Sequence, residues 1–187
     1  LNKAPIPENA KGLLQLMSHG GGLEKSFNNP LYREKLQDIP QEVMRQWVEY
    51  LCNNGDIVKI RNTGSVELDE KWFTPYMAEI HGTLGCLATN GGKDVKDLRE
   101  LHTEGMEYEI AVDYEGLKPT RWKKMKISDP HVAMRVKIIE MLGSEGPKMA
   151  DQIESRLPFS KQLVDRILHE LESRNVISVG FLSLIHI

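Results

Sequence analysis

The sequence is poor in cysteine and has no hydrophobic run long enough to cross a bilayer. Its two cysteines, Cys52 and Cys86, stand far apart among the 187 residues and belong to no paired motif. This excludes a disulfide framework and favours a reducing compartment. A membrane-spanning helix needs roughly 20 consecutive apolar residues, and no segment of the chain reaches that length. We therefore expect no membrane partner.

The chain also lacks an overall excess of positive charge. It carries 24 Lys and Arg residues against 27 Asp and Glu residues, which gives a formal net charge of −3. Proteins that hold nucleic acid by bulk charge have a large positive excess. That class is excluded here, so any contact with DNA must come from a local cluster of basic side chains.

Catalytic and metal-binding motifs are missing as well. A phosphate-binding loop needs closely spaced glycines followed by Lys and then Ser or Thr, whereas Gly91-Gly92-Lys93 is followed by Asp94. The 6 histidines and 2 cysteines show no metal-ligand spacing. We therefore expect no cofactor and no metal in this chain. Whether it belongs to an enzyme stays open, because a larger parent protein could hold the catalytic part.

Three helices and a hairpin are predicted in the first part of the chain. Helical periodicity covers residues 8–19, 32–36 and 40–53. From residue 56 to 68 the pattern changes to alternation around the turn Asn62-Thr63-Gly64, which is typical of a β-hairpin. Three helices followed by a hairpin is the element order of a winged-helix domain, which we assign to residues 8–73.

A similar order recurs near the other end of the chain. Helices are predicted over residues 129–142, 149–156 and 161–174, and a strand over 176–181. Ser160 is a favourable N-cap for the third of these helices. We therefore expect a second winged-helix domain over residues 129–181, truncated at its wing because no second strand is predicted. The apolar tail, residues 182–187, is interpreted as a candidate non-native addition.

A connector is predicted between the two blocks, over residues 74–128. It contains predicted helices at 74–87 and 94–104 and a predicted strand at 106–112, while residues 113–128 show no clear pattern. The fold class is therefore expected to be α+β and mostly α. The predicted architecture is a pair of tandem winged-helix (helix-turn-helix) domains with a connecting α/β segment.

One segment of the connector carries a local positive charge, although the chain as a whole is slightly acidic. Residues 116–127 contain no Asp or Glu and hold five basic side chains around one aromatic: Lys118, Arg121, Trp122, Lys123, Lys124 and Lys126. Such a segment could neutralise several phosphates while Trp122 stacks on a base or sugar. The alternative is a solvated basic strand whose tryptophan packs into a domain interface.

Two predicted helices add further candidates for DNA contact. Lys161, Gln162 and Arg166 lie on the polar face of the 161–174 helix, and Arg45 lies on the polar face of the 40–53 helix. Such side chains can reach base edges or phosphates from a helix in the major groove. Acidic neighbours cancel much of this charge, so a structural or protein-binding helix is an equally open interpretation.

The two helical blocks resemble the winged-helix region that follows the motor core of the large-helicase-related (Lhr) ATP-dependent DNA helicases. The first block carries the resemblance in Trp47-Val48-Glu49-Tyr50-Leu51-Cys52-Asn53-Asn54-Gly55-Asp56-Ile57-Val58-Lys59-Ile60 and in Glu70-Lys71-Trp72-Phe73. The second carries it in Asp129-Pro130, Gly146-Pro147, Ile153-Glu154-Ser155-Arg156 and Leu168-His169-Glu170-Leu171-Glu172-Ser173-Arg174-Asn175-Val176-Ile177-Ser178-Val179-Gly180-Phe181. Residues 90–128 lie outside the resemblance. In the second block Asn175 replaces the glycine usual in the family, and Val179 replaces a residue that is often basic.

The resemblance implies a superfamily 2 helicase that works in DNA repair, with this chain as its non-catalytic accessory region. The implied partners are single-stranded or forked DNA and the motor domains of the same parent chain. ATP and Mg would belong to the motor, which is missing from these residues, and the implied location is cytoplasmic, at the nucleoid. The alternative is a free-standing winged-helix transcriptional regulator, in which one block binds DNA and the other dimerises.

Overall fold

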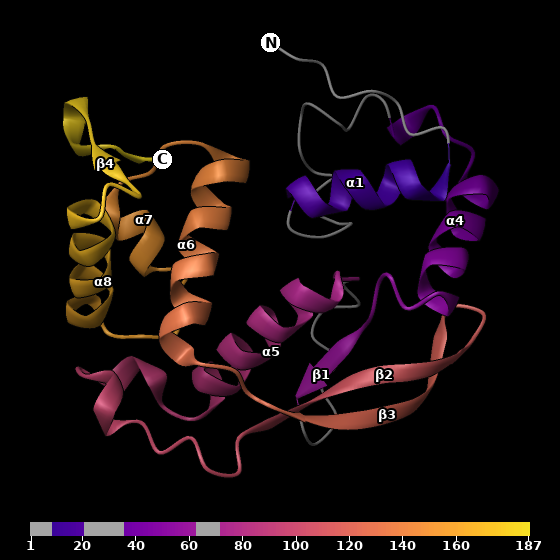
Figure 1. Cartoon of the computed structure of the whole chain (residues 1–187), viewed down its shortest axis with the longest axis horizontal. Coiled ribbons are helices and arrows are strands. Elements are labelled where there is room, and N and C mark those ends of the chain that lie inside the picture. Colours follow the sequence, from indigo (N-terminus) through magenta and orange to yellow (C-terminus); the bar gives the residue numbers. More distant parts are fainter. Residues whose placement is uncertain (1–8, 21–35, 63–71) are drawn as a thin grey trace. The chain divides into compact units, whose positions relative to one another are not determined.

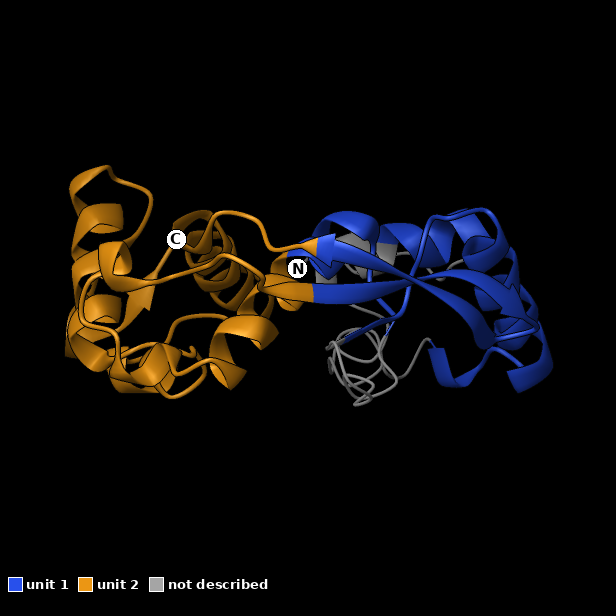
Figure 2. Cartoon of the chain, turned by 90° about the horizontal axis from the view of Figure 1, so that it is seen from below, with its two compact units in different colours: residues 1–79, 108–125 blue, residues 80–107, 126–187 orange. Residues whose placement is uncertain are grey.

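The computed structural model describes residues 9–20, 36–62 and 72–187, with a mixed α/β secondary structure. The chain divides into two compact units (Figure 2). Unit 1 comprises residues 1–79 and 108–125, and unit 2 comprises residues 80–107 and 126–187. The segment expected to be a connector is therefore divided between the units.

Unit 1 contains helices α1 (Ala10–Gly20) and α4 (Gln41–Asn53), both close to their predicted positions. In α4 the side chains of Val48, Leu51 and Cys52 are buried, and they share a core with residues of α1. The N–H of Asp56 donates to the Leu51 carbonyl at 2.9 Å, and Gly55 takes a φ of +78°. This is a Schellman end, which a glycine after the helix favours.

A three-stranded sheet belongs largely to unit 1, in the order β1-β2-β3 (Figure 1). Its strands are β1 (Ile60–Asn62), β2 (Glu107–Glu115) and β3 (Lys118–Lys126). Strand β1 runs antiparallel to β2, with Ile60 opposite Ile110. A two-residue turn joins β2 to β3, and Gly116 in it has a φ of +62°. The predicted strand at 106–112 is thus confirmed and longer than expected.

The hairpin expected over residues 56–68 lies only partly within the described residues. Val58 exchanges two backbone hydrogen bonds with Phe73, of 2.7 and 2.9 Å, and β1 pairs with β2. The second strand of that hairpin, which would follow the turn Asn62-Thr63-Gly64, lies outside the described residues, as does most of the predicted helix at 32–36. Pairing with β2 joins residues almost 50 positions apart, which local alternation does not reveal.

Unit 2 is built mainly from helices around one apolar core. Helix α5 (Pro75–Thr89) begins in unit 1 and continues into unit 2, where α6 (Pro130–Glu145), α7 (Ala150–Glu154) and α8 (Lys161–Ser173) follow. The Ser160 hydroxyl accepts a hydrogen bond from the Leu163 N–H, which confirms the predicted N-cap of α8. The largest fully buried side chains include Phe159, Met134 and Ile138.

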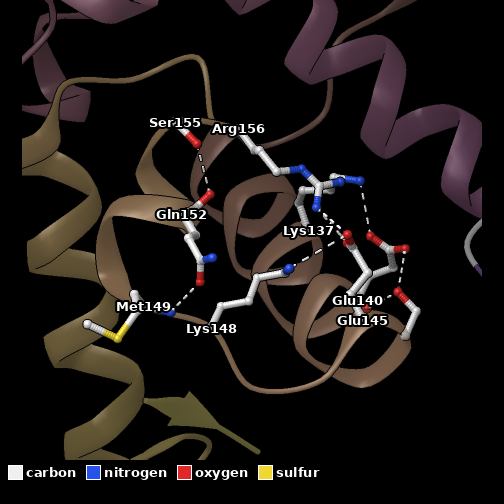
Figure 3. Close-up of polar contacts among 9 residues, drawn as sticks. Lys137, Glu140, Glu145, Lys148, Met149, Gln152, Ser155 and Arg156 are labelled. Carbon is white, nitrogen blue, oxygen red and sulfur yellow. Dashed lines mark hydrogen bonds and ion pairs between the residues drawn. The ribbon is translucent and has the colours of Figure 1, made fainter. Parts of the chain in front are cut away.

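Polar contacts hold α6 to α7 (Figure 3). The Arg156 guanidinium donates to both carboxylate oxygens of Glu145, at 2.5 and 2.6 Å. The N–H of Met149 donates to Oε1 of Gln152 at 2.8 Å, at the start of α7. These contacts fix the short connection between the two helices.

The helix predicted over residues 94–104 is wrong. Two short 3₁₀ turns, η1 (Gly92–Asp94) and η2 (Leu98–Glu100), occupy this part of the chain. The Asp97 carboxylate accepts from the Arg99 N–H at 3.0 Å, and the Ser160 hydroxyl donates to the Val95 carbonyl at 2.7 Å. These contacts use backbone groups that a helix would need for its own hydrogen bonds.

Two short strands follow α8, whereas the sequence predicted only one there. Strands β4 (Ser178–Val179) and β5 (Ile185–His186) pair antiparallel, with η3 (Phe181–Ser183) between them. Lys148 also bridges Ile185 in antiparallel fashion. Whether residues 182–187 are a non-native addition is a question of origin and stays a prediction.

In the described part of the chain, no helix is long and apolar enough to span a bilayer.

Candidate nucleic-acid interface

Strand β3 presents four exposed lysines at the edge of the sheet. The side chains of Lys118, Lys123, Lys124 and Lys126 are all exposed, and none forms an ion pair with another residue that the structure describes. Because side chains alternate along a strand, these cations point to both faces of the sheet. Lysines on an edge strand also discourage pairing with other sheets, so this arrangement has a structural use in addition to any binding role.

Arg121 is the one basic residue of β3 with an acidic partner among the described residues. Its Nε lies 2.7 Å from Oδ2 of Asp113, on the adjacent strand. Both side chains are largely exposed, 70% and 57%, respectively. Exposed ion pairs contribute little to stability and exchange readily with other partners. Arg121 therefore adds less free positive charge than the lysines do.

Trp122 lies on β3 in contact with a residue that sequence reasoning did not select. The guanidinium carbon of Arg61 lies 4.1 Å from the centroid of the Trp122 ring. Nε of Arg61 donates to Oε2 of Glu109 at 2.6 Å, and these two residues face each other in the β1–β2 register. Trp122 is partly exposed and belongs to neither apolar core cluster of the described residues.

A second aromatic group in unit 1 is buried and structural. The rings of Trp72 and Tyr114 have centroids 5.7 Å apart, and Nζ of Lys59 lies 4.9 Å from the Trp72 ring centroid. The Tyr114 hydroxyl donates to the Ala111 carbonyl at 3.0 Å. Burial raises the pKa of Tyr114 to about 12, so its hydroxyl stays protonated. With Trp72 only 8% exposed, this group packs the core and offers no open surface.

Arg45 does not add net positive charge to the surface of α4. Its guanidinium contacts Glu42 at 2.6 Å and Glu49 at 2.8 Å, one turn away on either side. The hydrogen bond from Arg45 lowers the pKa of Glu42, so this carboxylate stays ionised and keeps neutralising the arginine. The local charge of this group is negative.

The candidates on α8 have a mixed environment. Lys161 and Gln162 are exposed at the start of the helix. Nη1 of Arg166 lies 3.9 Å from Oδ2 of Asp97, a carboxylate that Arg99 also holds at 2.7 Å. Hydrogen bonds from Arg99 lower the pKa of Asp97 to about 2, so Asp97 is ionised throughout the physiological range. Arg166 is therefore partly neutralised by a residue that precedes the η2 turn.

A buried carboxyl lies beside the same helix. Glu154 of α7 is only 9% exposed, and its Oε1 has no hydrogen-bond partner among the described residues. Burial, followed by the hydrogen bond and charge of Asp165 on α8, raises the pKa of Glu154 to about 7. The start of α8 thus carries acidic as well as basic groups.

The basic residues of β3 are neighbours on one strand, whereas the other candidates belong to helices. Arg45 is on α4, and Lys161, Gln162 and Arg166 are in unit 2. Within the described ranges, no group of three or more His, Cys, Asp or Glu side chains could hold a metal ion. Cys52 and Cys86 are buried free thiols. Burial raises the pKa of Cys52 to about 11 and also raises that of Cys86.

Comparisons with known proteins give no relative on which to build. No family model matches this chain, and no curated protein or solved structure matches it.

Proposed function

We propose that this chain is a non-catalytic nucleic-acid-binding module and that strand β3 is its main contact with single-stranded or forked DNA. The observation that carries the proposal is the set of four exposed lysines on one edge strand, unpaired among the described residues, beside a partly exposed tryptophan. Backbone phosphates are bound by such cations independently of sequence. Because the overall charge is −3, any such binding needs a local cluster of cations such as this one.

The proposed architecture of residues 129–181 is a winged helix, whose last strand, β5, lies beyond this range at Ile185–His186. It is supported by the element order α6, α7, α8, β4, β5, with the Lys148 bridge to Ile185 between α6 and α7. In this interpretation α8 is the recognition helix. Its mixed charges make it a weaker DNA contact than β3, and Arg45 of α4 is weaker still because two glutamates neutralise it.

The proposed parent is an ATP-dependent DNA helicase of the Lhr type that works in DNA repair. Its support is the sequence resemblance described above, together with the element order from α6 to β5. ATP and Mg would be held by motor domains of the parent, on which this region would pack. Its location would be cytoplasmic, at the nucleoid.

The salt dependence of DNA binding tests the role of β3. For a single strand, log K changes with log salt by about −0.7 for each neutralised phosphate, so four lysines give a slope of roughly −3. The expected affinity is weak, with Kd on the order of 10⁻⁴–10⁻⁶ M. The double substitution Lys123→Ala with Lys124→Ala should flatten the slope by about 1–2.

The matched control removes two exposed lysines elsewhere, Lys11→Ala with Lys96→Ala. It has the same effect on net charge and should leave the slope near its parent value. An unchanged slope in the Lys123/Lys124 variant would show that the basic strand is structural. A symmetric dimer that prefers a palindromic duplex would instead support the transcriptional-regulator alternative.

A further inference from the structure

Arg61 and Trp122 together form a flat surface on the sheet of unit 1, and their side chains are already in contact without a ligand. Arg61 is on β1, Glu109 on β2 and Trp122 on β3, so all three neighbouring strands contribute (Figure 1). Glu109, whose side chain is 14% exposed, accepts from Nε of Arg61, and the guanidinium carbon lies 4.1 Å from the indole centroid. The Arg61 side chain keeps 29% of its surface exposed.

The guanidinium of Arg61 is already held in place before any ligand binds, which favours the stacking of a further planar group on it. A free arginine side chain loses considerable conformational freedom when it stacks on a ligand. Here the ion pair with Glu109 and the contact with Trp122 have already fixed that side chain. Tryptophan rings and arginine planes are also the two protein surfaces on which unpaired bases commonly stack.

A phosphate-binding group lies on the same face. Side chains of a strand alternate between faces, so Lys124 shares the face of Trp122 and lies about 7 Å further along the strand. Lys124 is exposed and has no ion-pair partner among the described residues. A stacking surface followed by a cation matches the alternation of base and phosphate along a nucleic-acid strand.

We propose that Arg61 and Trp122 form a stacking site for one unpaired base of a single strand, with Lys124 on the adjacent phosphate. This inference rests on the proposed function and adds a ligand class to it. In a duplex the bases are already stacked on each other, so the site would select unpaired nucleotides. Glu109 acts as a positioning residue that orients Arg61.

The test compares two single strands of equal charge. One is a twelve-nucleotide oligothymidine, and the other is an abasic strand of the same length. The lysines bind both through phosphate, whereas a stacking site binds only the first. The expected ratio of affinities is about 5- to 150-fold in favour of the oligothymidine, the range that a stacking free energy of about 1–3 kcal/mol gives.

Three variants locate the effect. Arg61→Lys keeps the charge beside Glu109 but removes the plane, and Trp122→Leu keeps an apolar side chain but removes the ring. Both should bring the ratio close to one, whereas Trp122→Phe should retain most of it. Thermal unfolding of each variant shows whether it folds. If Trp122→Leu does not fold, the comparison of Arg61→Lys with the parent protein is sufficient to test the site.

The outcomes separate the inference from the proposed function. A parent ratio near one overturns the stacking site, while a salt slope that the Lys123/Lys124 variant flattens would still support the basic strand as the DNA contact. A ratio that stays high in both Arg61→Lys and Trp122→Leu also overturns the site, since the base would then stack elsewhere. Failure to bind either strand overturns both proposals.

Discussion

Gly92 packs directly against the backbone of Pro158 in unit 2. A Cβ atom at position 92 would lie 2.2 Å from the Pro158 carbonyl oxygen and 2.9 Å from that of Leu87. Both neighbours are backbone atoms, which cannot move aside as a flexible side chain could. The absence of a side chain at this position therefore allows the η1 turn to close over the residues before α8.

Gly92→Ala is accordingly expected to destabilise the protein by about 1–3 kcal/mol, the usual cost of overpacking. Urea unfolding measures this change. Gly143→Ala is the matched control, because its Cβ would meet only a side-chain atom at 3.6 Å, an ordinary contact. An equal effect of both substitutions would contradict the close packing at Gly92.

The end of α8 depends on a left-handed residue. Asn175 has a φ of +58°, and the next N–H, from Val176, donates to the Leu171 carbonyl at 2.9 Å. Asn175→Gly should keep or slightly raise the free energy of unfolding, since glycine takes this conformation without strain. Asn175→Val should lower it by about 1–2 kcal/mol. Chemical unfolding measures the stability of the two variants. Equal stability of Asn175→Gly and Asn175→Val would argue against the left-handed cap.

The protonation of Glu154 should couple stability to pH. Its pKa is raised from 4.5 to about 7, so between these values the folded chain holds a proton that the unfolded chain has released. The contribution of this group to stability therefore falls as the pH rises through that window, by at most about 1.4 kcal/mol for each pH unit. Besides Asp165, the charges that act on it are Lys161 and Asp151.

Glu154→Gln mimics the protonated form and should lose this pH dependence. Its free energy of unfolding relative to the parent should become more favourable from about pH 5 to about pH 8, a range that spans the window. Glu172→Gln, at an exposed position of α8, is the control and should show a smaller change. A difference between Glu154→Gln and parent that stays constant over this range would refute the raised pKa.

Trp47 tests the register of α4. It packs against the unit 1 core but remains partly exposed. We expect Trp47→Ala to cost about 2–3 kcal/mol, below the roughly 3–5 kcal/mol for a fully buried tryptophan. Tyr50→Ala, at a side chain that is 52% exposed, should cost clearly less. Thermal unfolding compares the two, and a larger loss at Tyr50 would show that the helix is rotated.

Arg166 tests how far α8 contributes to DNA binding. Since Asp97 partly neutralises it, Arg166→Ala should change the salt slope less than the Lys123/Lys124 double substitution does. The slopes are measured with the same single-stranded oligonucleotide. A larger change at Arg166 would move the main DNA contact from β3 to α8.

Local signals were sufficient for the main helices of this protein. The periodicity of the sequence predicted where α4 and α8 lie, and Ser160 predicted the start of α8 because its hydroxyl caps a neighbouring N–H. The same reasoning failed over residues 94–104, where Ser160 and Asp97 use backbone groups that the helix needed. Sequence alone could not show this, because Ser160 is 65 residues from Val95.

The candidate site divides in the same way. The cluster of basic residues around Trp122 is contiguous, so the sequence by itself determined which cations lie together. Only the tertiary structure decided that Arg61 and Glu109 join Trp122, because strand pairing brings together residues 48 positions apart. Hydrogen bonds within a helix or cap depend on neighbours along the chain, whereas sheet order and cross-strand stacking depend on how distant segments meet.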